Sequence, residues 1–218
     1  VLQMSGNELT DLPKTIGYNR NLVTLNLSDN HLREVPDGII QLVNLNNLYL
    51  DKNLLEQLPR SIGLLNQLQS LHVSQNKIKT LPASIGLLAV LETFDVSENE
   101  LTELPSDLRQ LTLLRECYLN NNKLKTFPTC FVGRRTLEAL FVNHNQIPSI
   151  PDSCIRGLSH LQTLYANNNR IEDLPDTLQF LKRLKRLYLS HNNISFIPAC
   201  CCKLDELIFL SLVHFALR

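Results

Sequence analysis

The chain has 218 residues, 44% of them hydrophobic, which is enough to form a continuous apolar core. Its 21 Lys and Arg balance its 21 Asp and Glu, and this neutral charge argues against nucleic acid as a main partner, because phosphate binding needs a strongly basic surface. No apolar run is long enough for a transmembrane helix, so we expect no membrane span.

A period of 23 residues, with one interval of 24, runs along the whole chain. It is marked by nine asparagines: Asn7, Asn30, Asn53, Asn76, Asn99, Asn122, Asn145, Asn169 and Asn192. Prolines keep the same spacing: Pro13, Pro36, Pro59, Pro82, Pro105, Pro128, Pro151, Pro175 and Pro198. A fixed period in this range is typical of stacked-repeat proteins, in which each repeat contacts only its neighbours.

Each repeat reads L-x-x-L-x-L-x-x-N-x-L-x-x-L-P-x-x-I-x-x-L. The central L-x-L has the two-residue period of a short strand, with one face turned to a core. The Asn follows that strand, and its amide can pair backbone groups that a buried turn would leave unsatisfied. We therefore predict a ladder of stacked Asn side chains. The Pro then interrupts any sheet ladder, which predicts an irregular or single-turn helical return segment.

A few repeats depart from this pattern. Phe94 and Cys117 stand at core positions that are normally Leu. The repeat around Pro151 has one extra residue before Ile155, so we expect a slightly longer loop there. The last repeat has Phe215 in place of the Asn.

The repeat resembles the leucine-rich repeat family, with residues 22–42 (LVTLNLSDNHLREVPDGIIQL) as a nearly ideal copy. Its L-P-x-x-I-x-x-L half is similar to the intracellular subgroup represented by Shoc2 (Sur-8), the plant Ras-group repeats and the LAP proteins. The resemblance implies an α/β fold: a curved solenoid with a concave parallel β-sheet and an irregular or short-helical convex side. We expect residues 1–218 to form a single array of about nine to ten repeats. Because the repeat begins within a strand at Leu2, we expect a fragment of a longer chain.

The x residue inside each L-x-L points away from the core, since strand side chains alternate. From repeat to repeat this position gives Asn26, Tyr49, His72, Asp95, Tyr118, Phe141, Tyr165, Tyr188 and Ser211. The run Tyr118, Phe141, Tyr165, Tyr188 is unbroken, and exposed aromatics are enriched at interface hot spots. We predict that these four bind a protein partner. Polar residues at nearby positions are expected to form the rim: Glu116, His144, Arg186 and His191. The alternative is that the aromatics only pack against each other across strands.

Catalysis and metal binding have little support in the sequence. There is no Gly-rich phosphate loop, and Ser70, His72 and Asp95 should project from a flat surface without a closed pocket. His144 lies two strands from His191, roughly 10 Å at strand spacing, which is too far for shared metal ligation. We expect no catalytic residue, no metal and no cofactor.

The cysteines bear on the compartment. The chain has six Cys, and three are consecutive, at 200–202. Adjacent cysteines rarely bridge each other, so we interpret the six as reduced thiols used as small hydrophobic residues, which favours a cytoplasmic protein. A disulfide-bonded cap, or a metal or lipidation site, is the alternative.

We predict a non-enzymatic protein–protein interaction scaffold. The resemblance implies intracellular signalling, with a small GTPase or a phosphatase subunit as the partner class. Two alternatives are an extracellular ligand-recognition ectodomain and the recognition arm of a larger enzyme.

Overall fold

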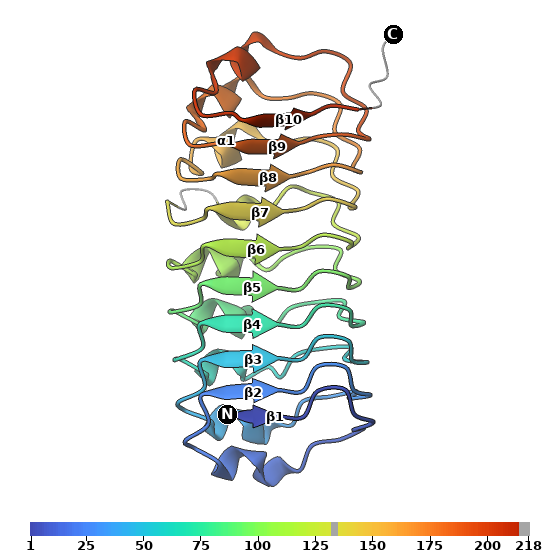
Figure 1. Cartoon of the computed structure of the whole chain (residues 1–218), viewed down its shortest axis with the longest axis vertical. Coiled ribbons are helices and arrows are strands. Elements are labelled where there is room, and N and C mark those ends of the chain that lie inside the picture. The colour runs from blue at the N-terminus through green and yellow to red at the C-terminus, as the bar shows by residue number, and fades with distance from the viewer. Residues whose placement is uncertain (132–134, 214–218) are drawn as a thin grey trace. The chain divides into compact units, whose positions relative to one another are not determined.

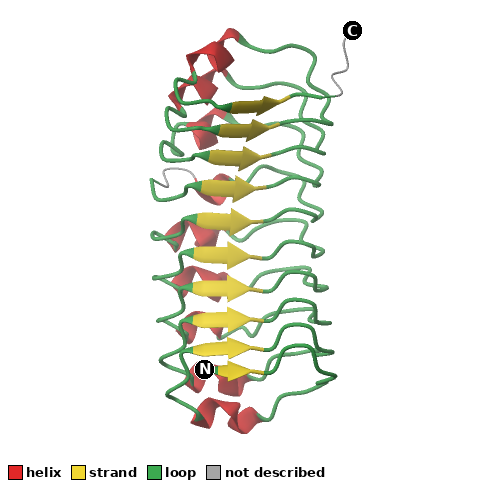
Figure 2. Ribbon diagram, viewed as in Figure 1, coloured by secondary structure: helices red, strands yellow, loops and turns green. Residues whose placement is uncertain are grey.

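The computed structural model of the chain describes residues 1–131 and 135–213. It divides into two compact units, Val1–Leu114 and Arg115–Arg218. In each unit, successive repeats supply one three-residue or shorter strand and one short helical segment (Figure 1). The strands lie side by side, and the helical segments lie behind them (Figure 2).

The first unit contains five parallel strands that pair in chain order. They are β1 (Leu2–Gln3), β2 (Thr24–Asn26), β3 (Asn47–Tyr49), β4 (Ser70–His72) and β5 (Thr93–Asp95). Its helical segments are all 3-10 turns: η1 (Lys14–Tyr18), η2 (Asp37–Gln41), η3 (Ile62–Leu64), η4 (Ala83–Leu87) and η5 (Ser106–Gln110).

The second unit repeats this design within the residues that the structure describes. Its parallel strands are β6 (Glu116–Tyr118), β7 (Ala139–Phe141), β8 (Thr163–Tyr165), β9 (Arg186–Tyr188) and β10 (Phe209–Ser211). Its helical segments are η6 (Thr129–Phe131), α1 (Asp152–Ile155), η7 (Asp176–Phe180) and η8 (Ala199–Lys203).

The core follows the predicted alternation. In strands β2 to β9 the middle residue is buried, and Leu25, Phe94, Cys117 and Leu187 are each 0% exposed. Phe94 and Cys117 therefore replace Leu at true core positions. The residues on either side of each middle residue are partly or fully exposed, as the two-residue period requires.

Most helical segments begin directly after the repeating proline. Pro36, for example, has extended backbone (φ −67°, ψ 146°), and η2 starts at the next residue. This geometry is expected, because the proline ring fixes φ near −65° and the missing N–H removes a ladder donor. The proline therefore marks where the chain leaves the sheet side and turns into the return segment.

The repeat with the extra residue was expected to form a longer loop, and it instead forms α1, a single α-helical turn. The amide of Arg156 donates to the carbonyl of Asp152 at 3.4 Å, a bond that spans four residues. The 3-10 turns of the other repeats close over three. The additional residue is thus absorbed by widening the helical turn.

The predicted asparagine ladder is confirmed. Nδ2 of Asn53 donates to the carbonyls of Leu27 (3.0 Å) and Leu50 (3.1 Å), and its Oδ1 accepts from the amide of Leu32 at 2.9 Å. One side chain thus connects successive repeats and satisfies several buried backbone groups. The residue before the ladder position has left-handed backbone, as at Lys52 (φ 52°) and His144 (φ 54°).

Each unit is therefore an α/β leucine-rich-repeat-type solenoid segment with a parallel sheet and short helical returns. The single array of about nine to ten repeats stays a prediction, and Phe215 lies outside the described residues. Across the described part of the chain, no helix combines the length and apolar character needed to cross a bilayer.

Candidate functional site

The first and third residues of each strand do not pack into the core. We call the sheet face that carries them the open face. The helical segments lie on the opposite side of the strands in both units (Figure 2). Side chains on the open face are thus held at fixed spacing by the backbone ladder beneath them. The two units fill this face with different chemistry.

In the second unit, the four aromatic residues predicted to bind a partner form one continuous stack. Ring centroids lie 4.5 Å apart for Tyr118 and Phe141, 4.8 Å for Phe141 and Tyr165, and 3.9 Å for Tyr165 and Tyr188. The interplanar angles are 12°, 18° and 11°. Each inner ring is covered on both faces by its neighbours, so the stack presents ring edges and Tyr hydroxyls to a partner.

Phe209 extends this stack beyond the predicted residues. Its ring lies 4.7 Å from that of Tyr188 at 33°, and its side chain is 45% exposed. In the sheet, however, Phe209 pairs with Arg186 rather than with Tyr188. It belongs to the first strand position, which carries no aromatic residue in the preceding repeats of this unit, so the column of aromatics at the third position did not include it. We call Tyr118, Phe141, Tyr165, Tyr188 and Phe209 the aromatic stack.

Two predicted rim residues flank the stack directly. The hydroxyl of Tyr118 donates to Oε2 of Glu116 at 2.9 Å. A hydrogen bond with Tyr188 raises the pKa of the Tyr165 phenol, and burial adds to the rise, while the nearby Arg186 guanidinium lowers it. The structure thus brings Glu116 and Arg186 to the polar edge of the stack.

The other two rim residues occupy the turn that follows each strand. His144 and His191 are exposed and have left-handed backbone, with φ of 54° and 56°. Nε2 of His144 lies 3.3 Å from Nδ2 of Asn168, the residue at the same place in the next repeat. These histidines sit beyond the strand ends, so they border the open face rather than line it.

In the first unit, the open face carries a cluster of potential metal ligands. Asp51, His72 and Asp95 each offer one ligand atom, and these atoms lie within 4.8 Å of one another. Nδ1 of His72 is 3.9 Å from Oδ2 of Asp95. The sequence predicted that Ser70, His72 and Asp95 project from a flat surface. Asp51 joins His72 and Asp95 because it lies two residues beyond β3 and turns toward the next repeats.

The electrostatic environment of Asp95 is unfavourable for its charge. Burial raises the pKa of Asp95 above its ordinary value, and the negative charge of Asp51 raises it further. Hydrogen bonds from the Ser97 hydroxyl and amide oppose this effect, as does the nearby His72. The carboxylate is therefore held in place but incompletely compensated.

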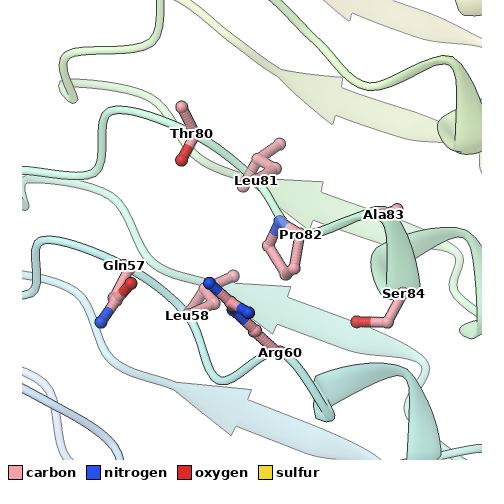
Figure 3. Close-up of a pocket in the computed structure, with 8 residues that line it drawn as sticks. All are labelled: Gln57, Leu58, Arg60, Thr80, Leu81, Pro82, Ala83 and Ser84. Carbon is pink, nitrogen blue, oxygen red and sulfur yellow. The ribbon is translucent and has the colours of Figure 1, made fainter.

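The first unit also has recesses on its return segments, away from this cluster. One of about 370 Å³ lies between the segments that precede η3 and η4 (Figure 3). It is lined by Gln57, Leu58, Arg60, Thr80, Leu81, Pro82, Ala83 and Ser84. None of the predicted site residues lines it, and its mixed lining gathers no set of catalytic side chains.

The fold and the open face define a class of protein: a stacked-repeat solenoid that displays variable side chains on a regular sheet. Comparison with known protein families identifies the family within this class. A leucine rich repeat model matches residues 20–78, 66–124, 120–171 and 167–215. The chain belongs to the leucine-rich repeat family. This fold is typically a non-enzymatic interaction module, suited to binding other proteins.

Several solved structures are similar to this chain. A leucine-rich repeat protein of Leptospira interrogans is 36% identical, with a TM-score of 0.95 over 99% of this chain and 55% of the other. The plant peptide hormone receptor RGFR1, solved with RGF2, is 29% identical, with a TM-score of 0.76 over 96% and 39%. Internalin C2 of Listeria monocytogenes is 25% identical, with a TM-score of 0.79 over 92% and 84%. A comparison with curated proteins finds no significant match.

Proposed function

We propose that this protein is a non-enzymatic interaction scaffold that binds a protein partner on the open face of its second unit. The observation that carries this proposal is the aromatic stack, five rings in sequence on a solvent-facing surface. Aromatic residues are enriched at interface hot spots because they bury a large area with few rotatable bonds.

The chemistry of the stack narrows the kind of contact. Since neighbouring rings cover each other's faces, a partner meets the ring edges, the Tyr hydroxyls and the charged groups of Glu116 and Arg186. An apolar strip edged by hydrogen-bonding groups is the usual composition of a protein–protein interface. His144 and His191 extend the polar border at the turn.

The proposed compartment and signalling role rest on the repeat sequence. The L-P-x-x-I-x-x-L half resembles the Shoc2-like intracellular subgroup, so we propose a cytoplasmic role in signal transduction. Under this proposal the partner is a small GTPase or a phosphatase subunit, and no cofactor or metal takes part in binding it.

Binding can be tested by affinity capture, followed by measurement with the purified partner. Tyr165→Ala and Tyr188→Ala should each weaken binding by roughly 1–3 kcal/mol, as hot-spot truncations do. A purified small GTPase and a phosphatase catalytic subunit are the first candidates to titrate. Far-UV circular dichroism should stay close to that of the wild type.

Two matched variants make the test specific. Asp176→Ala changes an exposed residue at the start of η7, on the helical side, and should leave affinity unchanged. His144→Asn removes a rim imidazole but keeps a side chain that tolerates left-handed backbone. If partners survive the Tyr165/Tyr188 double variant and are lost with Asp176→Ala, binding occurs on the helical side and the proposal is wrong.

The compartment can be tested through the cysteines. Cys202 is exposed, whereas Cys200 and Cys201 are buried, and burial raises the pKa of Cys201 to about 12. We expect the folded protein to label first at Cys202 and to release six titratable thiols after denaturation. Mass spectrometry showing an intramolecular disulfide in protein purified from its native source would contradict the cytoplasmic assignment.

One observation favours a second function. The plant peptide hormone receptor RGFR1, which this chain resembles, was solved in complex with RGF2, so an extracellular ligand-recognition ectodomain is the alternative. The chain spans 55% of the Leptospira protein and 39% of the plant receptor, so a recognition arm of a larger enzyme is a further candidate. Glycosylation and disulfide bonds on the native protein distinguish the ectodomain.

A further inference from the structure

The Asp51, His72 and Asp95 cluster on the first unit is independent of the aromatic stack. Its three members come from successive repeats. The strand ladder sets the spacing of His72 and Asp95, and Asp51 lies two residues beyond β3. The side chains of His72 and Asp95 are only 25% and 19% exposed. The cluster therefore sits partly within the open face rather than at the tips of mobile surface side chains.

Neighbouring serines hold both carboxylates by hydrogen bonds. Asp95 is held through one oxygen and Asp51 through both, because the Ser28 hydroxyl donates to Oδ2 of Asp51 at 3.3 Å. The amide and hydroxyl of Ser74 donate to Oδ1 of Asp51, at 2.9 and 2.8 Å. The amide and hydroxyl of Ser97 donate to Oδ1 of Asp95, at 2.9 and 2.7 Å. Oδ2 of Asp95 instead faces His72. Hydrogen bonds of this kind are how outer-shell partners orient carboxylate ligands for a metal.

The imidazole is oriented as well. The ring of Tyr49 stacks on that of His72, with centroids 4.9 Å apart at 29°. Nδ1 of His72 lies on the side of Asp95. The arrangement thus limits rotation of the imidazole before any ligand arrives, which lowers the entropy that binding would cost.

We propose that Asp51, His72 and Asp95 form a site for a divalent transition-metal ion such as Zn²⁺. Ligand atoms around such an ion lie about 3–3.5 Å apart, given metal–ligand distances of about 2.1 Å. The His72–Asp95 pair is already at 3.9 Å and all three ligand atoms lie within 4.8 Å of one another, so side-chain shifts of about 1–2 Å close the set. A divalent charge also compensates the two facing carboxylates, one of which is destabilised by burial.

The donor set selects the class of ion. Mg²⁺ and Ca²⁺ prefer oxygen ligands alone, whereas an imidazole with carboxylates suits Zn²⁺, Co²⁺ or Ni²⁺. Three protein ligands leave a position open for water or for a side chain of another molecule. The site therefore gives the first unit a chemistry that the second unit lacks among its described residues.

Titration of the purified full chain with Co²⁺ tests the site, because the visible absorption of Co²⁺ reports nitrogen and oxygen coordination. We expect one saturable equivalent, and an upward shift of Tm with Zn²⁺ in the same stoichiometry. His72→Gln, Asp51→Asn and Asp95→Asn should each weaken binding at least about tenfold, since even outer-shell changes cost that much. Ser74→Ala, a positioning variant, should weaken it about tenfold.

Matched variants keep the test specific. Asp29→Asn removes an exposed carboxylate from a turn of the same unit, and His144→Gln removes an exposed imidazole elsewhere. Both should bind Co²⁺ as the wild type does. The proposal is overturned if the wild type shows no saturable equivalent, or if any one of the three ligand variants binds as tightly as the wild type.

Discussion

The two units of this protein share one framework and differ in what they display. Asn53 in the first unit and Asn169 in the second make the same kind of contacts, donating to carbonyls of their own and the preceding repeat. Yet the open face of the first unit carries the Asp51, His72 and Asp95 cluster, and that of the second carries the aromatic stack.

This difference shows how the repeat separates stability from function. Positions that face the core, together with the ladder asparagines, have side chains fixed by packing and hydrogen bonding. The first and third strand positions contact mainly their equivalents in adjacent repeats, so they can change without disturbing the core. The two halves of the chain also differ in charge. Residues 1–109 contain 8 Lys/Arg and 13 Asp/Glu, whereas residues 110–218 contain 13 Lys/Arg and 8 Asp/Glu.

The largest expected effect falls on the shared framework. Asn53→Leu and Asn169→Leu should each lower the free energy of unfolding by about 3 kcal/mol or more, because each leaves several buried backbone groups unpaired at about 1–3 kcal/mol apiece. Chemical denaturation monitored by circular dichroism measures both. The exposed Asn193→Ala is the control and should change stability by less than about 0.5 kcal/mol. A large loss in one unit with none in the other would show that the ladders are not equivalent.

A smaller effect is expected from the stack. Tyr165→Ala removes contacts with Phe141 and Tyr188, and stacked pairs contribute about 0.5–1.5 kcal/mol each, so it should cost about 1–3 kcal/mol of stability. His72→Ala loses one ring contact, with Tyr49, together with the 3.9 Å contact with Asp95, and should cost less. Denaturation of both variants, with Tyr165→Phe as the ring-retaining control, compares the two faces. If Tyr165→Ala and His72→Ala lower the free energy of unfolding equally, the stack does not stabilise its unit more than the Tyr49–His72 contact does.

The smallest effect concerns Asp95. Since burial raises its pKa in the folded state, ionised Asp95 reduces stability at neutral pH, and the penalty is lost as pH falls through the folded-state pKa. Asp95→Asn should therefore raise Tm at pH 7 in metal-free buffer, by less than about 4 °C. The difference from the wild type should shrink toward acidic pH. A lower Tm for Asp95→Asn at pH 7 would mean that the Ser97 hydrogen bonds outweigh burial.

Much of the fold could be predicted from the sequence because the same pattern of Leu, Asn and Pro recurs in successive repeats. The strand positions, the core role of Phe94 and Cys117, and the Asn ladder were all predicted correctly. The single α-helical turn at α1 was not, because an inserted residue can widen a helical turn or lengthen a loop, and hydrogen-bond geometry decides between them.

The sequence by itself determined the repeat family, the buried residues and the aromatic column, since periodicity and alternation depend only on residue type and spacing. The tertiary structure alone decided that Phe209 joins the stack from another strand position, and that Asp51 reaches His72 and Asp95 across repeats. Those contacts depend on side-chain rotamers and on the Ser74 and Ser97 hydrogen bonds, which no linear spacing specifies.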